Sequence, residues 1–288
     1  MKVTILYPGD YFDCRKVDTD YRYEYEEAVR FPEFQILFYN YDEFVAGQPL
    51  RIVPRQPEAG ICVYRGWMLH PHKYGELYSG LLKLGLRLVN SPQEYENCHE
   101  FPNSYGLLEG YTPGLKYFAR DQKIPWYEVR AAFPRFMMKD FVKSVKGTDF
   151  PVYFDGGYAD AEMDRYVERF VEMRGTLFEK GIVLKEYVDL KRADGNTNEY
   201  RVFFLYHRIL SISPNSGQAG GDRLPEALAE AIPALDSNFY TVDFAQLADG
   251  GWTVIETGDG QVSGLSPDQF VFKYYEGLLA GVREAAQP

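Results

Sequence analysis

The stretch that decides the fold runs from residue 239 to residue 260 and reads FYTVDFAQLADGGWTVIETGDG. It contains two runs rich in aromatic and β-branched residues, Phe239–Leu247 and Trp252–Thr257. The dipeptide Asp249-Gly250 between them is a frequent two-residue hairpin turn. The stretch therefore predicts two antiparallel strands joined by a tight turn.

The turn determines which residues of the two strands face each other. With a two-residue turn, Ala248 pairs with Gly251, and Asp243 lies opposite Glu256 on the same face. Carboxylates at cross-strand distance repel each other unless a cation lies between them. Because Mg²⁺ is bound by one or two carboxylates and by substrate phosphates, the register predicts a magnesium site. A longer loop would turn Glu256 to the other face, and Asp259 in the following turn is either a further ligand or only shapes that turn.

Composition and charge limit the class of protein. The chain has 288 residues, of which 45% are hydrophobic and 25% charged, and these values predict a folded globular protein. The net charge of −11 argues against bulk binding to nucleic acid or to an anionic membrane, so any anion site must be local. The three cysteines, Cys14, Cys62 and Cys98, lack paired spacing, and no leader or membrane span is evident. We expect a cytoplasmic protein.

The pattern of expected elements changes along the chain. The first third alternates strands (Lys2–Tyr7, Gln35–Tyr39, Ile61–Arg65, Leu86–Asn90) with helices (Arg22–Arg30, Lys73–Leu84, Pro92–Cys98). That order predicts an α/β domain with a mostly parallel sheet. Beyond Tyr105 we expect an α+β arrangement: helix Gly114–Lys123, strands Trp126–Arg130 and Arg135–Val142, helix Asp160–Glu179, strand Ile182–Leu190, a hairpin of Glu199–Tyr206 with Ile209–Pro214, the hairpin quoted above, and a helix from Ser266 to about Arg283.

Two further segments carry charged residues on strand-like patterns. Glu199 and Arg201 alternate in NEYRVFFLY and share one face, either as a surface ion pair or as a ribose and phosphoryl contact. Lys139 lies within the apolar run FMMKDFVK and needs an anion or a carboxylate partner if it is buried. Lys143 and Lys146 follow it, as phosphate contacts or as ordinary surface lysines.

Taken in order, these segments resemble the ATP-grasp superfamily over about residues 112 to 265. The matching segments are KIPWYEV, RFMMKD, IVLKEYV, NEYRVF and the hairpin. FVKSVKG, RGWML and ETGDGQVSGL further resemble a clade of that superfamily named for one arginine and two lysines. The resemblance implies a pre-ATP-grasp-like α/β domain at 1–105 and an α+β ATP-grasp domain at 106–288. The latter would comprise a lid subdomain at about 123–188 and a metal and catalytic subdomain at about 189–288.

The resemblance also implies roles for individual residues. ATP would be bound by Lys139, Lys143, Lys146, Lys185, Glu186, Tyr187, Val188 and Glu199, with Lys139 and Arg201 acting in catalysis and Asp243, Glu256 and Asp259 binding Mg²⁺. Most members have an asparagine two residues after the last glutamate, and this chain has Gly258 there. Arg65 would bind an acceptor carboxylate, or it is a strand-end arginine in water.

The implied function is an ATP- and Mg²⁺-dependent ligase. It would join a small-molecule or peptide carboxylate to an amine through an acyl phosphate. Two alternatives use the same fold. One is a phosphotransferase acting on a hydroxyl group, and the other is an ATP-binding module that recognises a protein or RNA partner.

Overall fold

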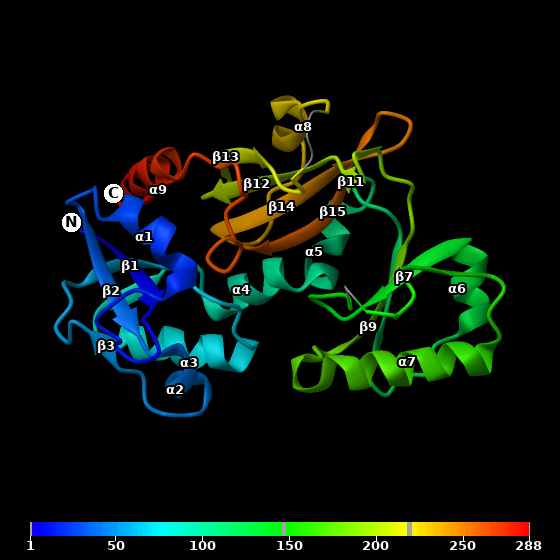
Figure 1. Cartoon of the computed structure of the whole chain (residues 1–288), viewed down its shortest axis with the longest axis horizontal. Coiled ribbons are helices and arrows are strands. Elements are labelled where there is room, and N and C mark those ends of the chain that lie inside the picture. The colour runs from blue at the N-terminus through cyan, green and yellow to red at the C-terminus, as the bar shows by residue number, and fades with distance from the viewer. Residues whose placement is uncertain (1, 146–147, 218–220, 288) are drawn as a thin grey trace.

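Three β-sheets organise the chain in the computed structural model, which describes residues 2–145, 148–217 and 221–287 (Figure 1). The first sheet has the strand order β3-β2-β1-β4-β5. Its strands are β1 (Val3–Pro8), β2 (Phe34–Tyr39), β3 (Ile52–Val53), β4 (Gly60–Tyr64) and β5 (Leu86–Leu88). All neighbours pair in parallel except β2 and β3. The predicted mostly parallel sheet is confirmed.

Helices connect the strands of this first sheet or follow its last strand. They are α1 (Arg22–Ala28), preceded by a 3₁₀ turn at Thr19–Tyr21, α2 (Tyr41–Val45), α3 (Pro71–Leu82) and α4 (Pro92–His99). Helix α4 begins with a capping box, in which Ser91 accepts from the Glu94 amide and the Glu94 carboxylate accepts from the Ser91 amide. The first third of the chain is therefore an α/β unit, as its alternating pattern predicts.

The central sheet is antiparallel and has the order β13-β12-β14-β15. Its strands are β12 (Glu199–Leu205), β13 (Arg208–Pro214), β14 (Phe239–Gln246) and β15 (Trp252–Asp259). One face, which carries Val202, Val242 and Val254, packs on α4 and α5 (Phe101–Leu108). Phe203 on the other face packs against α9 (Val271–Ala285), which also contacts β1 and α1 (Figure 1). The last helix thus joins the first and central sheets.

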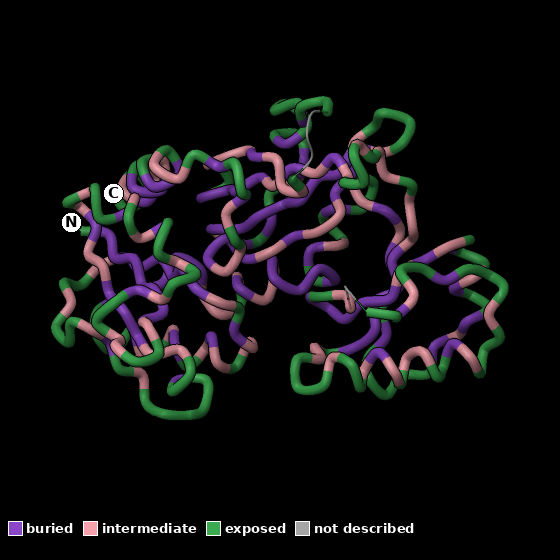
Figure 2. The backbone as a smooth tube through the Cα atoms, in the orientation of Figure 1, coloured by how far each residue is buried: buried purple, intermediate pink, exposed green. Residues whose placement is uncertain are grey.

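The third sheet, β6-β9-β7-β8, forms a separate lobe. It consists of β6 (Leu115–Ala119), β7 (Arg135–Lys139), β8 (Phe154–Asp155) and β9 (Gly181–Glu186), with helices α6 (Trp126–Ala132) and α7 (Asp160–Arg174) and a 3₁₀ turn at Gly175–Leu177. Apolar side chains of α7 pack on this sheet, and the face of α7 that points away from the sheet is exposed (Figure 2). The remaining elements are β10 (Arg192–Ala193), β11 (Asn196–Thr197) and α8 (Glu226–Glu230). No helix in the described ranges is long and apolar enough to cross a bilayer.

Two predicted elements of this lobe are wrong. The segment expected as a helix at Gly114–Lys123 contains strand β6, which pairs with β9. The segment expected as a strand at Trp126–Arg130 is the first part of helix α6, where Trp126 and Val129 are buried at a helical spacing of three. Long-range pairing with β9 overrides the local preference of the first segment, and burial of one face overrides the β-propensity of the second.

The decisive hairpin has the predicted partners but not the predicted turn. Leu247, not Ala248, faces Gly251, because the Leu247 amide donates to the Gly251 carbonyl at 2.8 Å. The loop therefore has three residues, and Gly250 within it has a positive φ of 97°. A β-bulge between the Phe244–Val254 and Asp243–Glu256 pairs then inserts Ile255 as an extra residue. The two shifts cancel, and Asp243 faces Glu256.

One glycine of the first sheet is required by close packing. A Cβ atom on Gly66 would lie 2.3 Å from the Tyr64 hydroxyl oxygen and 2.4 Å from two ring atoms. We expect Gly66→Ala to lower the free energy of unfolding by about 1–3 kcal/mol, because the buried tyrosine must move. Gly75→Ala is the control: nothing lies near its Cβ position in α3, so alanine should stabilise that helix by up to about 1 kcal/mol. Urea unfolding measures both, and equal stability of the two variants would contradict this account.

Candidate functional site

Arg201, which is partly buried, and Asp243, which is buried, form an ion pair across β12 and β14. Arg201 Nε donates to Asp243 Oδ1 at 2.8 Å, and Nη2 donates to Oδ2 at 2.7 Å, in a bidentate arrangement. Arg201 Nη1 also donates to the Gly264 carbonyl at 2.9 Å. Burial disfavours the charge of Arg201, but its bonds to Asp243 outweigh burial and raise its pKa. The pair holds the guanidinium in one orientation.

Two lysines of the lobe that contains the third sheet reach the central sheet beside this pair. Lys139, the last residue of β7, lies with its Nζ 3.2 Å from Glu256 Oε1. Lys185 in β9 donates to the carbonyl of Ile255, the bulge residue, at 2.6 Å. Both ammonium groups lie over the ring of Phe101, at 5.8 Å and 4.2 Å from its centre. Lys185 thus bonds to the carbonyl oxygen of the bulge residue, and Lys139 pairs with Glu256, the residue that follows it.

Lys185 is an unusually placed cation. Its side chain is buried, and burial lowers its pKa well below the ordinary value, with a further lowering from the positive charge of Lys139. Glu256 opposes that lowering. Two lysines and an arginine therefore lie beside two carboxylates, and an anionic ligand bound here would favour the charged form of Lys185.

The expected repulsion between Asp243 and Glu256 is wrong for the metal-free protein. Each carboxylate has its own cation, Arg201 for Asp243 and Lys139 for Glu256. The hairpin alone contains no cation near these two residues, and the compensating charges come from β12 and from the lobe of the third sheet. The roles of Asp243 and Glu256 as metal ligands remain a prediction.

A cavity of about 430 Å³ opens over this cluster between the first sheet, the central sheet and the segment after β7. Its charged lining residues are Lys143, Arg201, Asp243 and Glu256. His99, at the end of α4, also lines it, and burial and then the charge of Lys143 lower the His99 pKa to about 3. The imidazole is therefore neutral near pH 7.

Asp259 does not join Asp243 and Glu256. It lies three residues after Glu256, so the alternation of β15 directs it to the opposite face, where it pairs with Tyr240. There Asn90 Nδ2 donates to Asp259 Oδ2 at 2.5 Å, and burial raises the Asp259 pKa to about 7. Within the described residues, no three His, Cys, Asp or Glu side chains form a metal-binding group. The alternation of side chains along a strand can be read from the sequence, and it argues against Asp259 as a ligand of the same metal ion.

Gly258 does share the face of Glu256, and two hydroxyl groups occupy the space beside it. A Cβ atom on Gly258 would lie 2.9 Å from Ser263 Oγ and 3.0 Å from Thr241 Oγ1. These two hydroxyls are hydrogen-bonded to each other at 2.9 Å, and both residues line the cavity. Position 258 therefore has room for glycine but not for a larger side chain without rearrangement.

Arg65 has a different set of partners from the acceptor carboxylate expected for it. It is buried, and its Nε and Nη2 donate to both carboxylate oxygens of Glu24, at 2.9 Å and 2.8 Å. Its other contacts are the carbonyl oxygens of Gly260, Gln261 and Ser263. Arg65 therefore ties α1 to the segment that follows β15, and neither a substrate contact nor a solvent-exposed arginine is needed to explain it. Sequence reasoning missed Glu24, whose only signal was an acid on the buried face of a short helix.

The remaining predicted residues lie around the same cluster. Glu186, Tyr187 and Val188 are partly buried at the end of β9, where the Glu186 carboxylate accepts from the Gly114 amide at 3.0 Å. Glu199 is partly buried at the start of β12, beside Thr197. Lys143 is exposed, and the prediction for Lys146 lies outside the described residues. Sequence reasoning also missed Phe101 and His99, which lie in a segment that carries no motif.

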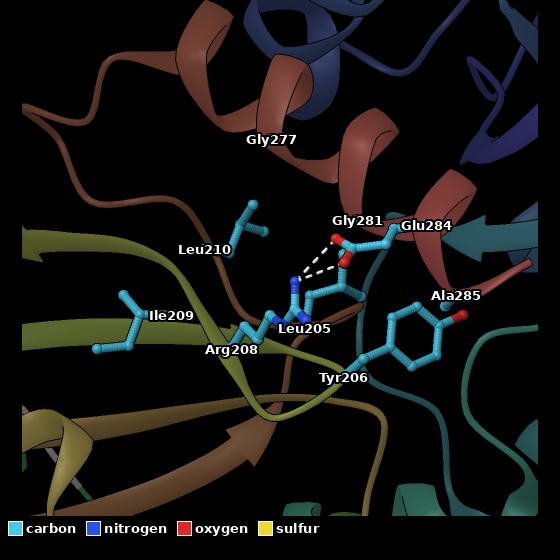
Figure 3. A pocket seen from close by; sticks show the side chains of 9 residues that line it. All are labelled: Leu205, Tyr206, Arg208, Ile209, Leu210, Gly277, Gly281, Glu284 and Ala285. Carbon is cyan, nitrogen blue, oxygen red and sulfur yellow. Dashed lines mark hydrogen bonds and ion pairs between the residues drawn. The ribbon is translucent and has the colours of Figure 1, made fainter. Parts of the chain in front are cut away.

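A second cavity, of about 410 Å³, lies between the β12–β13 hairpin and α9 (Figure 3). Its charged lining residues, Arg208 and Glu284, bond to each other at 2.7 and 2.8 Å. The convergent charges of Arg201, Asp243 and Glu256 lie instead at the first cavity. We therefore place the candidate site there.

The three-sheet architecture, with charged groups converging between two antiparallel sheets, is that of the ATP-grasp fold. The D-alanine–D-alanine ligase of Bacillus anthracis superposes with a TM-score of 0.61 at 15% identity, covering 99% of this chain and 98% of that one. D-cycloserine synthetase DcsG gives 0.60 at 13% identity, with 97% and 99% covered. The ATP-grasp ligase PsnB, complexed with its minimal precursor, Mg and ADP, gives 0.57 at 12% identity, with 98% of each chain covered.

The chain belongs to the family described as ATP-grasp domain, R2K clade family 3, whose profile matches residues 124–278, more than half of its length. A comparison with curated protein sequences found no match. The resemblance stated from the motifs and the predicted fold class, an α/β unit followed by an α+β ATP-grasp fold, are confirmed. The predicted domain and subdomain boundaries remain predictions.

The buried pair predicts the effect of neutralising Asp243 in the metal-free protein. Asp243→Asn leaves the Arg201 guanidinium without its charged partner, so we expect the free energy of unfolding to fall by about 3 kcal/mol with chelator present. Asp268→Asn, at an exposed position, is the matched control and should change stability by less than about 0.5 kcal/mol. Urea unfolding followed by tryptophan fluorescence measures both. A stability of Asp243→Asn equal to or above that of the wild type would restore the repulsion hypothesis.

Proposed function

We propose that the protein is an ATP- and Mg²⁺-dependent ligase that joins a carboxylate to an amine through an acyl phosphate. The observation that carries the proposal is the convergence of Lys139, Lys185 and Arg201 on Asp243 and Glu256. Family membership supports it, since ATP-grasp relatives include ligases and one solved relative is bound to Mg and ADP.

The two carboxylates fit a magnesium ion. Mg²⁺ in nucleotide-dependent enzymes takes one or two protein carboxylates and completes its shell with water and phosphate oxygens. Asp243 and Glu256 would hold it, with the hydroxyl groups of Thr241 and Ser263 near the glycine that replaces the usual asparagine. When bound, the ion would neutralise charge on the phosphates.

Each residue of the cluster then has a chemical task. Lys139 and Lys185 would bind the triphosphate as point charges, and the planar fork of Arg201 would contact the phosphoryl group that is transferred. The substrate carboxylate oxygen attacks the γ-phosphorus, the bond to the leaving oxygen of ADP breaks, and an acyl phosphate forms. The amine then attacks the acyl carbon, so that phosphate leaves, an amide forms and one proton is released.

The adenine would lie against Glu186–Val188 at the end of β9, and Glu199 would meet the ribose. Lys143 and Lys146 would add phosphate contacts from the segment after β7. Three free cysteines fit the predicted cytoplasmic location. Phosphoryl transfer to a hydroxyl group would use the same cluster but would release no phosphate.

ATP binding tests the first half of the proposal. We expect ATP with Mg²⁺ to raise the thermal unfolding temperature more than GTP does, because a ligand selective for the folded state stabilises it by mass action. Arg201→Lys should retain much of this shift and lose most of the turnover, since lysine keeps the charge without the two-point fork. Phosphate release in step with amide formation, in a screen of acid and amine mixtures, measures turnover. Absence of any ATP-dependent shift would refute the assignment.

Proton uptake tests the role of Lys185. Triphosphate beside Lys185 favours its charged form, so the lowered pKa should rise on binding and the complex should take up protons at pH values between the pKa of the free and that of the bound protein. Calorimetric titration with ATP in two buffers of different ionisation enthalpy measures that uptake. Lys185→Met should abolish it, while Lys273→Met, on the exposed face of α9, should leave it unchanged. Equal uptake by the wild type and Lys185→Met would assign the proton to another group.

A further inference from the structure

The candidate site has an aromatic wall opposite the charged residues. The wall consists of Tyr21, Tyr41 and Trp67, which line the same 430 Å³ cavity as Asp243 and Glu256. Each follows a parallel strand of the first sheet: Tyr21 lies after β1, Tyr41 after β2 and Trp67 after β4. Ligands of open α/β sheets bind outside the carboxyl ends of such strands. The wall therefore lies where this sheet is expected to contact a ligand.

The three rings form one continuous surface. The centre of the Trp67 ring lies 5.4 Å from that of Tyr21, at an interplanar angle of 77°, and 4.9 Å from that of Tyr41, at 66°. These are edge-to-face contacts, and all three residues are only partly buried. Aromatic surface therefore remains available to a further ring.

The position of Trp67 is held by its surroundings. The buried hydroxyl of Tyr64 donates to the Trp67 carbonyl at 2.7 Å, and the Tyr41 hydroxyl donates to the Met68 carbonyl at 3.0 Å. Gly66 allows this segment to pass against the Tyr64 ring, where a Cβ atom would clash. A preformed wall needs little ordering when a ligand binds, which favours affinity.

The distribution of charge around the cavity indicates what the wall accepts. The charged lining residues of the described chain, Lys143, Arg201, Asp243 and Glu256, all come from beyond the first sheet. The first-sheet side adds only Tyr21, Tyr41, Trp67 and Met68. An ammonium and carboxylate pair placed on this side would lose water without gaining charged partners. An apolar planar group would lose little and would gain aromatic contacts.

We propose that the aromatic wall binds the aromatic group of a carboxylic acid substrate, whose carboxylate is directed toward Arg201 and Lys143. This inference rests on the proposed function and adds the chemical class of the acid. The acid is either a free aromatic acid or the carboxyl-terminal residue of a peptide, since both present the same ring and carboxylate.

Binding of matched acids, without turnover, tests the inference. The probes are 3-phenylpropanoate, its saturated analogue 3-cyclohexylpropanoate, the ring-free butanoate and the ring-bearing amine 2-phenylethylamine. Calorimetry or ligand-observed NMR measures each in the presence of Mg²⁺ and a non-hydrolysable ATP analogue. We expect 3-phenylpropanoate to bind about five- to tenfold more tightly than the cyclohexyl acid, and more tightly still than butanoate. The dipeptides Gly-Phe and Gly-Ala, compared with L-phenylalanine, separate the peptide source from the free acid.

Variants of the wall make the test specific. Trp67→Leu should remove the preference for the phenyl over the cyclohexyl acid, and Trp67→Phe should retain most of it. Tyr127→Leu is the matched control, because that ring is 81% exposed on α6, outside the cavity. Should Trp67→Leu fail to fold, the comparison of Trp67→Phe with Tyr21→Leu replaces it, and Tyr21→Leu should weaken the phenyl preference.

Three outcomes would overturn the inference: equal binding of the phenyl and cyclohexyl acids, a preference that survives Trp67→Leu, or tighter binding of the amine than of the acid. The thermal shift with ATP and Mg²⁺ is measured on the same preparations. A normal ATP shift without an aromatic preference refutes the aromatic wall alone, whereas loss of the ATP shift in the wild type refutes the proposed function.

Discussion

One extra residue in one strand determines the geometry of the site. Ile255 bulges out of β15, and the register beyond it places Glu256 opposite Asp243. The same bulge leaves the Ile255 carbonyl to accept from Lys185 of the third sheet. Bulges commonly redirect side chains near functional sites, and this one serves both the carboxylate pair and a lysine contact. Without it, the three-residue turn would turn Glu256 to the other face of the sheet.

Among the described residues, the cluster around the bulge contains both paired and unpaired charges close together. Within each ion pair, Arg201 with Asp243 and Lys139 with Glu256, the two charges neutralise each other. The buried Lys185 instead contacts a backbone carbonyl and an aromatic ring. Buried charges of this kind contribute little net stability compared with apolar packing, because desolvation offsets their attraction. Net stability alone therefore does not explain their arrangement, and the proposed binding of a polyphosphate and a divalent cation would account for it.

The first sheet and the central sheet are joined through Arg65. Its guanidinium, bonded to Glu24, also holds the carbonyl oxygens of Gly260, Gln261 and Ser263. The next residue of that segment, Gly264, accepts from Arg201. An arginine of the first sheet thus supports the segment that orients the catalytic candidate, while Trp67, two residues later, faces the cavity. Three consecutive residues thus have three different structural roles: Arg65 forms an internal ion pair, Gly66 allows the chain to pass close to Tyr64, and Trp67 lines the cavity.

The sequence by itself determined the main strands and helices of the first third, except α2 and β3, together with the two hairpins and the family. It also predicted that Asp243 faces Glu256, but through a two-residue turn that is wrong, and the prediction holds because the bulge restores the register. Alternation within a strand is a local property, so it can be read from the residues; it also excludes Asp259 from that face. Only the tertiary structure decided that Gly114–Lys123 contains a strand, that a bulge compensates for the turn, and that Arg65, Lys139 and Lys185 have the partners observed. Those outcomes depend on chain segments far apart in sequence, whose packing no local pattern encodes.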